Sequence, residues 1–197
     1  MTVVGLLLAA GAGSRMGQPK ALVHDREGSW LLRSVEVLLE GGCDAVRVVL
    51  GAAYDDAAAL LARHSDPRVT PVRSLDWAEG MSASLHDGLV GLADDVDAVV
   101  VHLVDLPDVG ADVVAALLTG GAEARRLARA AYDGRPGHPV LIGRSHWAGV
   151  RDSLAGDEGA KGYLRAHDHE LVECGHLAGG HDVDSWGGPT PHQRRSG

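Results

Sequence analysis

The sequence contains no phenylalanine, and its four tryptophans and three tyrosines make up only 4% of 197 residues. Alanine, glycine, valine and leucine dominate instead, so we expect a core of small aliphatic side chains. The apolar fraction of 45% is close to that of ordinary globular proteins. A chain of this length suits one domain and is long enough to bury roughly 70% of its unfolded surface.

Cysteine is also scarce, because Cys43 and Cys174 are the only two. Two cysteines without a Cys-x-x-Cys pair exclude a disulfide framework and argue against a structural zinc site. The scattered histidines show no His-x-x-x-His spacing. The formal net charge of −9 makes nonspecific binding of nucleic acid unfavourable. A protein of this charge that binds anionic nucleotides needs locally placed arginine, lysine or a metal ion.

Long apolar runs are absent too, since none reaches the roughly 18 residues that span a membrane. The apolar residues 3–10 have no basic region before them, and a glycine-rich loop follows, so they indicate a core strand rather than a signal segment. We therefore expect a cytoplasmic protein that does not bind membranes.

The stretch from Val3 to Val23 carries the strongest functional pattern. Its apolar start predicts a buried strand, and the following AAGAGSRMGQPK predicts a loop. Glycines let a backbone lie close to a ligand, and successive N–H groups in such a loop bind anions. Arg15 and Lys20 add positive charge. These features favour a phosphate-bearing ligand. The glycines alone are equally compatible with an ordinary strand–loop connection, in which the two basic residues would have no function.

Strand and helix patterns alternate along the rest of the chain. Strands are predicted at 3–8, 45–50, 69–72, 97–104, 127–132, 139–142 and 170–174, and helices at 30–40, 55–64, 81–92, 111–118, 144–154 and 157–167; residues 187–197 are predicted to be a disordered tail. This order indicates an α/β fold with a mostly parallel sheet and helices on both faces. Ligands bind such sheets at the carboxyl ends of the strands. Residues 9–20 and Asp105 should meet there.

Acidic residues at two places are candidate metal ligands. Asp105 follows the strand pattern DAVVVHLV, where a carboxylate can hold Mg²⁺ together with substrate phosphates. It could instead cap the helix near residue 111, a role that Asp108 fits better. Asp182 and Asp184 share one face of an extended segment, so both can point at one ion. A solvated acidic turn is the alternative for this pair.

The segment LAAGAGSRMGQPKAL closely resembles the signature of nucleotidyltransferases with the nucleotide-diphospho-sugar transferase fold. Within these MobA-like NTP transferases it is most similar to the molybdenum cofactor cytidylyltransferases of MocA type. Further similar motifs follow in family order: WAEGMSASL, VDLP, GHPV, GDEGAK and DVDS. The resemblance covers residues 3 to 185 and implies a three-layer α/β/α, Rossmann-like domain over residues 1–186. The chain departs from the family at Ser74 (usually Asn), at Lys161 (usually Arg) and after Ser185, where Pro-Glu-Asp is missing.

The resemblance also implies roles for individual residues. Arg15, Lys20 and Asp105 would be catalytic, and Mg²⁺ would be held by Asp105 with Asp182 or Asp184. The acceptor would be bound by His138, Pro139, Asp157 and Gly159, and the nucleotide by Leu8, Ala9, Ala10, Gly11, Gly13, Ser14, Arg15, Lys20, Gly80, Ser82, Ser84 and Asp105. Structural alternatives remain open: Ser82 as a helix cap, Ser84 as a buried serine, His138-Pro139 as a turn and Asp157 as a helix N-cap.

The implied activity is Mg²⁺-dependent transfer of CMP from CTP to the phosphate of molybdopterin, with release of pyrophosphate. In the resembled superfamily Leu-Ala-Ala-Gly is associated with cytidine and Leu-Ala-Gly-Gly with guanosine, so Leu8-Ala9-Ala10-Gly11 implies CTP; a methyl group at Ala10, which leaves less room than glycine, is consistent with exclusion of a purine. We expect a monomer or a weak dimer that serves a molybdenum hydroxylase. The rival hypotheses are a nucleotidyltransferase for another acceptor, such as a sugar phosphate or phospholactate, and a non-catalytic accessory protein for hydroxylase maturation.

Overall fold

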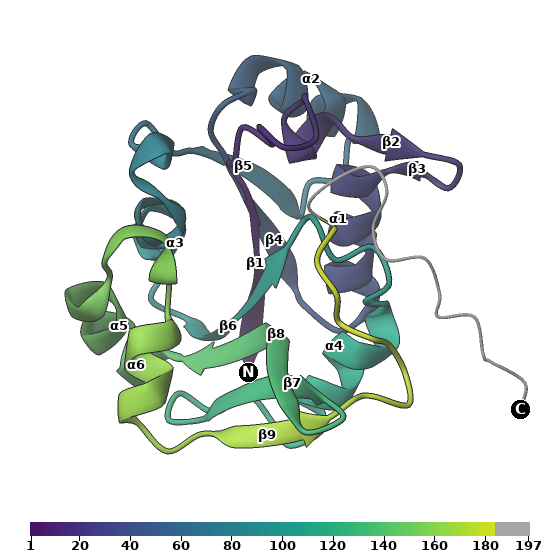
Figure 1. Cartoon of the computed structure of the whole chain (residues 1–197). Coiled ribbons are helices and arrows are strands. Elements are labelled where there is room, and N and C mark those ends of the chain that lie inside the picture. The colour runs from purple at the N-terminus through teal and green to yellow at the C-terminus, as the bar shows by residue number, and fades with distance from the viewer. Residues whose placement is uncertain (184–197) are drawn as a thin grey trace, which may run out of the picture.

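The computed structural model describes residues 1–183, which form one mixed sheet between two layers of helices (Figure 1). The sheet has the strand order β5-β4-β1-β6-β8-β7-β9. Its strands are β1 (Thr2–Ala9), β4 (Ala45–Leu50), β5 (Val69–Arg73), β6 (Val96–Leu103), β7 (Leu127–Tyr132), β8 (Arg135–Gly143) and β9 (Glu170–Glu173). A short hairpin of β2 (His24–Asp25) and β3 (Gly28–Ser29) forms a second sheet.

In the seven-stranded sheet all strand pairs are parallel except those that involve β8, which runs antiparallel to β6 and to β7. The predicted α/β fold with a mostly parallel sheet is therefore confirmed. The β1 strand lies between β4 and β6, with Leu7 opposite Val48 on one side and His102 on the other. This central position explains why residues 3–8 are apolar throughout: both faces of β1 are covered.

Helices cover each face of the sheet. Packing of their buried side chains assigns α1 (Trp30–Glu40), α2 (Tyr54–His64) and α4 (Ala111–Leu118) to one face. The opposite face is covered by α3 (Met81–Leu89), α5 (Trp147–Ser153) and α6 (Lys161–Ala166). Short 3-10 turns occur at Lys20–Leu22, Trp77–Glu79, Arg144–His146 and Gly156–Glu158.

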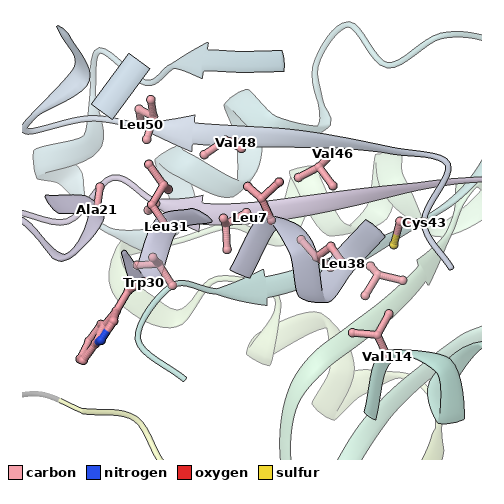
Figure 2. Packing of buried hydrophobic residues seen from close by; sticks show 14 of the residues in the cluster. Leu7, Ala21, Trp30, Leu31, Leu38, Cys43, Val46, Val48, Leu50 and Val114 are labelled. Atoms are coloured by element: carbon pink, nitrogen blue, oxygen red, sulfur yellow. The ribbon is translucent and has the colours of Figure 1, made fainter. Parts of the chain in front are cut away.

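The core beneath α1 follows directly from its sequence. The buried positions of WLLRSVEVLLE recur with helical spacing, and Leu31, Val35 and Leu38 are fully buried. Figure 2 shows Leu31 and Leu38 beside Leu7 of β1 and Val48 of β4. Ser29 caps the helix, since its hydroxyl accepts a hydrogen bond from the N–H of Leu32 at 3.4 Å. The predicted bounds of this helix, 30–40, are correct.

Other predicted bounds were wrong. The helix expected at 81–92 ends at Leu89, and the strand expected at 139–142 extends over Arg135–Gly143 because it pairs with two neighbours. The helix expected at 157–167 is divided into a 3-10 turn and α6, because Gly159 between them has a positive φ of 53°. The predicted tail at 187–197 lies outside the described residues.

Candidate functional site

A cleft of about 400 Å³ opens at the carboxyl ends of β1 and β6. Its walls come from three places in the sequence: the loop after β1, the segment that leads into α3, and the end of β6. The lining residues are Leu8, Ala9, Ala10, Gly11, Gly13, Ser14, Arg15, Lys20, Trp77, Ala78, Gly80, Met81, Ser84, Leu103, Val104, Asp105 and Asp157. Eleven of the twelve residues predicted to bind the nucleotide lie in this list. The exception is Ser82.

The loop after β1 is held in shape by a glycine that no other residue could replace without movement. Gly13 has a φ of +59°, and a Cβ added to it would lie 2.0 Å from the carbonyl oxygen of Gln18. The N–H of Met16 donates to the carbonyl of Gly13 at 2.8 Å, and the Met16 side chain is buried in the core. Met16 thus anchors the turn from inside, and the two residues before it, Ser14 and Arg15, line the cleft.

Lys20 and Asp105 form an ion pair across the cleft. Lys20 Nζ lies 2.5 Å from Asp105 Oδ2, with 18% and 15% of the two side chains exposed. An ion pair this sheltered is screened less than one at the surface. The two residues are 85 positions apart, and the parallel pairing of β1 with β6 brings them together. The prediction that residues 9–20 and Asp105 meet at one edge of the sheet agrees with this geometry.

The last described residues, 182 and 183, lie beside Asp105. The N–H of Val183 donates to the carbonyl of Asp105 at 2.9 Å, and Asp182 is exposed. Asp184 falls outside the described residues. Within residues 1–183, no three His, Cys, Asp or Glu side chains form a group that could hold a metal ion by themselves. One carboxylate with substrate phosphates suffices for Mg²⁺, so Asp105 fits the ion in company with a bound nucleotide.

Asp108 does not have the role that the sequence suggested. Its Oδ2 accepts hydrogen bonds from the N–H groups of Gly179 and Gly180, both at 3.0 Å. The N-cap of α4 is Gly110. The carboxylate of Asp108 therefore fixes the carboxyl-terminal segment just before it reaches Asp105.

Trp77 is held against the loop after β1 by another glycine. A Cβ on Gly51 would lie 2.5 Å from Cγ of Trp77 and 2.7 Å from the carbonyl oxygen of Ala10. The absence of this atom lets the indole pack closely over the end of β4, beside Ala10. Ala10 and Trp77 both line the cleft and contribute apolar surface to it.

The amino-terminal end of α3 is capped by a residue that is distant in sequence. Oδ1 of Asp157 accepts a hydrogen bond from the N–H of Met81 at 3.3 Å. Gly80 makes this approach possible, because a Cβ there would lie 2.4 Å from the same oxygen. Asp157 was predicted to bind the acceptor or to cap its own helix. The cap of α6 is instead Ala160, and Asp157 borders the nucleotide cleft.

Ser82 strengthens the same junction. It is buried, and its Oγ accepts a hydrogen bond from the N–H of Gly159 at 3.2 Å. The hydroxyl therefore bonds to the backbone after the Gly156–Glu158 turn, and the residue lies outside the cleft lining. The alternative interpretation of Ser82 as a helix cap is wrong, since the N-cap of α3 is Gly80. Gly159 is buried at this junction and is not among the residues that line the cleft.

The remaining predicted acceptor residues lie near a smaller hollow of about 20 Å³. His138 of β8 lines it, while Pro139 is buried in the strand and lines neither cavity. Burial lowers the pKa of His138 to about 3, with contributions from Arg129, His102 and Lys161. The imidazole is therefore neutral at physiological pH. This hollow shares Leu8 and Met81 with the cleft, so the two spaces adjoin.

Comparison with known families agrees with this arrangement. The model of the MobA-like NTP transferase domain matches residues 5–171. The chain belongs to this family. The family resemblance inferred from the motifs is thus confirmed, and no helix in residues 1–183 is long and apolar enough to cross a membrane.

Relatives of the MobA-like chain have diverse names. This chain is 35% identical to the nicotine blue oxidoreductase of Paenarthrobacter nicotinovorans over 193 residues, and the match covers 93% of this chain and 92% of the relative. The crystal structure of Rv0371c from Mycobacterium tuberculosis superposes with a TM-score of 0.76 at 25% identity and covers 94% of each chain. A manganese complex of Rv0371c has a TM-score of 0.67 at 24% identity, with 88% and 87% covered.

Motif reasoning on this MobA-like chain missed two contributions. Leu103 and Val104 line the cleft as the last residues before Asp105, which could have been expected from their position. Arg129 lines the smaller hollow from the middle of β7. The only sequence feature that could have pointed to Arg129 is its charge within LARAAY, a segment otherwise made of small and apolar residues.

Proposed function

We propose that the protein is a divalent-cation-dependent nucleotidyltransferase that transfers CMP from CTP to the phosphate of molybdopterin or Mo-molybdopterin and releases pyrophosphate. The observation that carries the proposal is the Lys20–Asp105 pair, which sits in the same cleft as the glycine loop. A cation and a carboxylate at one point of a nucleotide-sized cleft suit a reaction in which phosphate charge must be bound and redistributed.

The reaction needs little proton chemistry from the protein. An acceptor phosphate is already ionised near neutral pH, so it attacks the α-phosphorus of CTP while the bond to the β-phosphate oxygen breaks. Catalysis then consists mainly of positioning and charge stabilisation. Arg15 and Lys20 would bind the departing pyrophosphate oxygens, and the loop N–H groups near Gly13 would hold the triphosphate. Asp105 would hold Mg²⁺, which when bound neutralises phosphate charge.

Base selection is assigned to Ala10. Its methyl group is buried at the cleft wall and leaves less space than glycine would. Replacement Ala10→Gly should bring the rates with CTP and GTP closer together. The measurement is pyrophosphate release with each nucleotide at equal concentration. An unchanged CTP/GTP ratio would exclude this role for Ala10.

The main test uses purified protein, Mg²⁺, CTP and a phosphorylated pterin. We expect pyrophosphate release that depends on all three, and its loss in Asp105→Asn while CTP binding persists. If wild type and Asp105→Asn both bind CTP and neither turns it over with any acceptor, the accessory-protein hypothesis for hydroxylase maturation replaces this one. Sugar phosphates and phospholactate serve as the alternative acceptors in the same assay.

A second candidate function is oxidoreduction, and it rests on the relative from Paenarthrobacter nicotinovorans, which is 35% identical over nearly the whole chain. The cleft that suits CTP also offers an apolar wall, which includes Trp77 and Ala10, against which a planar ring can stack. The discriminating assay offers the protein NADH or NADPH with a quinonoid dye and follows loss of the reduced nicotinamide. Oxidation of the cofactor without any nucleotidyl transfer would favour this candidate.

A further inference from the structure

The ion pair between Lys20 and Asp105 gives this carboxylate a counter-charge from the protein itself. Nζ of Lys20 lies 2.5 Å from Oδ2 of Asp105, and only 18% and 15% of the two side chains are exposed. Both residues line the nucleotide cleft. The lysine ammonium therefore stands at the carboxylate to which the proposed function assigns a divalent cation.

The backbone on both sides of the pair is held in place. Lys20 follows Pro19 and begins a 3-10 turn, in which the N–H of Val23 donates to the carbonyl of Lys20 at 3.2 Å. The carbonyl of Asp105 accepts the N–H of Val183 at 2.9 Å. The movable part is the lysine side chain, because its four-carbon stem is flexible. Rotation of this one side chain is enough to open the pair.

A divalent cation and the ammonium of Lys20 compete for the same carboxylate. Mg²⁺ lies about 2.1 Å from its oxygen ligands, so an ion on Oδ2 of Asp105 would stand within about 5 Å of Nζ. Positive charges this close repel each other, and a sheltered cleft screens them less than open water does. Within residues 1–183 no cluster of three metal-binding side chains is available to outweigh the repulsion. The cation site is therefore weak as long as Lys20 contacts Asp105.

A nucleoside triphosphate supplies what the protein lacks. Its phosphate oxygens offer Lys20 a partner of higher charge than one carboxylate. They also complete the ligands of the ion, since Mg²⁺ is usually held by one or two carboxylates together with substrate phosphates. Gly13, Ser14 and Arg15 line the same cleft as the ion pair, so the proposed phosphate site and the pair share one space.

We infer that Lys20 is a gate on the cation site. It occupies Asp105 until the triphosphate draws the ammonium away, so the cation alone binds weakly and the cation and the nucleotide strengthen each other's binding. This inference rests on the proposed function, because it takes Asp105 as the carboxylate that holds the cation and Lys20 as a phosphate ligand. Its consequence has an unexpected sign: loss of Lys20, a group proposed to be catalytic, should strengthen binding of the cation when no nucleotide is present.

The test measures the binding of Mn²⁺ without nucleotide, through the free-ion signal in electron paramagnetic resonance. Lys20→Gln should bind Mn²⁺ at least about tenfold more tightly than wild type, because a positive charge in contact with the carboxylate is removed. Lys161→Gln is the matched control, since it changes the net charge equally and Lys161 does not line the cleft. It should bind Mn²⁺ like wild type. The gain should vanish when Lys20→Gln is combined with Asp105→Asn.

The movement of Lys20 is followed in a second measurement, which is simple because Lys20 and Lys161 are the only lysines of the chain. Protein labelled with ¹³C at the lysine ε-carbons should give two side-chain signals. CTP added together with EDTA, so that no divalent cation is free, should shift the signal of Lys20 and leave that of Lys161 in place.

The inference is overturned if wild type and Lys20→Gln bind Mn²⁺ alone with equal affinity, or if the gain persists with Asp105→Asn. It is also overturned if calorimetry shows that CTP binds while the Lys20 signal stays unchanged, a result that needs wild type only and so does not depend on the folding of any variant. Failure of the proposed function has a different signature: the complete assay would give no pyrophosphate, although Mn²⁺ alone still bound more tightly to Lys20→Gln.

Discussion

The most quantitative prediction concerns His102, in the middle of the sheet. Its side chain is 1% exposed, and neither ring nitrogen has a hydrogen-bond partner within residues 1–183. Burial lowers its pKa from 6.5 to about 4. Below pH 6.5 His102 therefore binds a proton in the unfolded chain but not in the folded chain. The free energy of unfolding falls as the pH is lowered, until the pH reaches about 4. At pH 5 the loss from this residue amounts to about 2 kcal/mol.

The test compares urea unfolding of wild type and His102→Leu at pH 7 and pH 5. The leucine has a similar volume, does not titrate and leaves no buried nitrogen unpaired, so the variant should be the more stable at both pH values. Between the two, wild type should lose about 2 kcal/mol more than the variant. Because the pKa of His138 is lowered as well, some fall should persist in the variant.

His176 provides the control, since it is exposed in the structure and His176→Leu should keep the wild-type dependence on pH. Parallel losses in wild type and His102→Leu would refute the reasoning. Such a result would mean that the ring of His102 keeps a compensating partner in the folded protein, so that its protonation is not penalised.

Three further predictions concern the cleft. Asp105→Asn should reduce Mg²⁺-dependent pyrophosphate release at least about a hundredfold, as expected when a key electrostatic group is removed; an effect under tenfold would contradict it. Gly13→Ala should lower the free energy of unfolding by about 1–2 kcal/mol, because Gly13 has a φ of +59°, and it should weaken CTP binding measured by calorimetry. Gly11→Ala is the control: no atom lies near the added Cβ, so the free energy of unfolding should not change. Asp157→Ala should destabilise the protein by about 1 kcal/mol and raise the Kd for CTP, while Asp157→Asn, which keeps the accepting oxygen, should resemble wild type; equal effects of the two would exclude capping of α3.

Much of the fold was predictable because its signals are local. The apolar run before the glycine loop, the helix pattern at 30–40 and the alternation of strands and helices each depend on neighbouring residues. The meeting of Lys20 with Asp105 followed from a general property of parallel sheets, whose carboxyl ends lie at one edge. These predictions needed no knowledge of which strands are adjacent.

The errors share a different cause. The capping roles considered for Asp157, Ser82 and Asp108 assumed bonds within their own segments, yet each side chain bonds to a segment more than 70 residues away. A short polar side chain caps whichever backbone N–H is nearest in space, and sequence spacing does not contain that information. Arg129 was overlooked for the same reason, since its significance depends on His138 and Lys161 lying beside it.

The hydrogen bond between Val183 and the carbonyl of Asp105 has a practical consequence for work with this protein. The backbone of Asp105, the carboxylate that we propose holds the cation, is braced by Val183, and the segment before Val183 is held through Gly179, Gly180 and Asp108. A truncation before residue 183 should therefore be treated as a change to the proposed site itself.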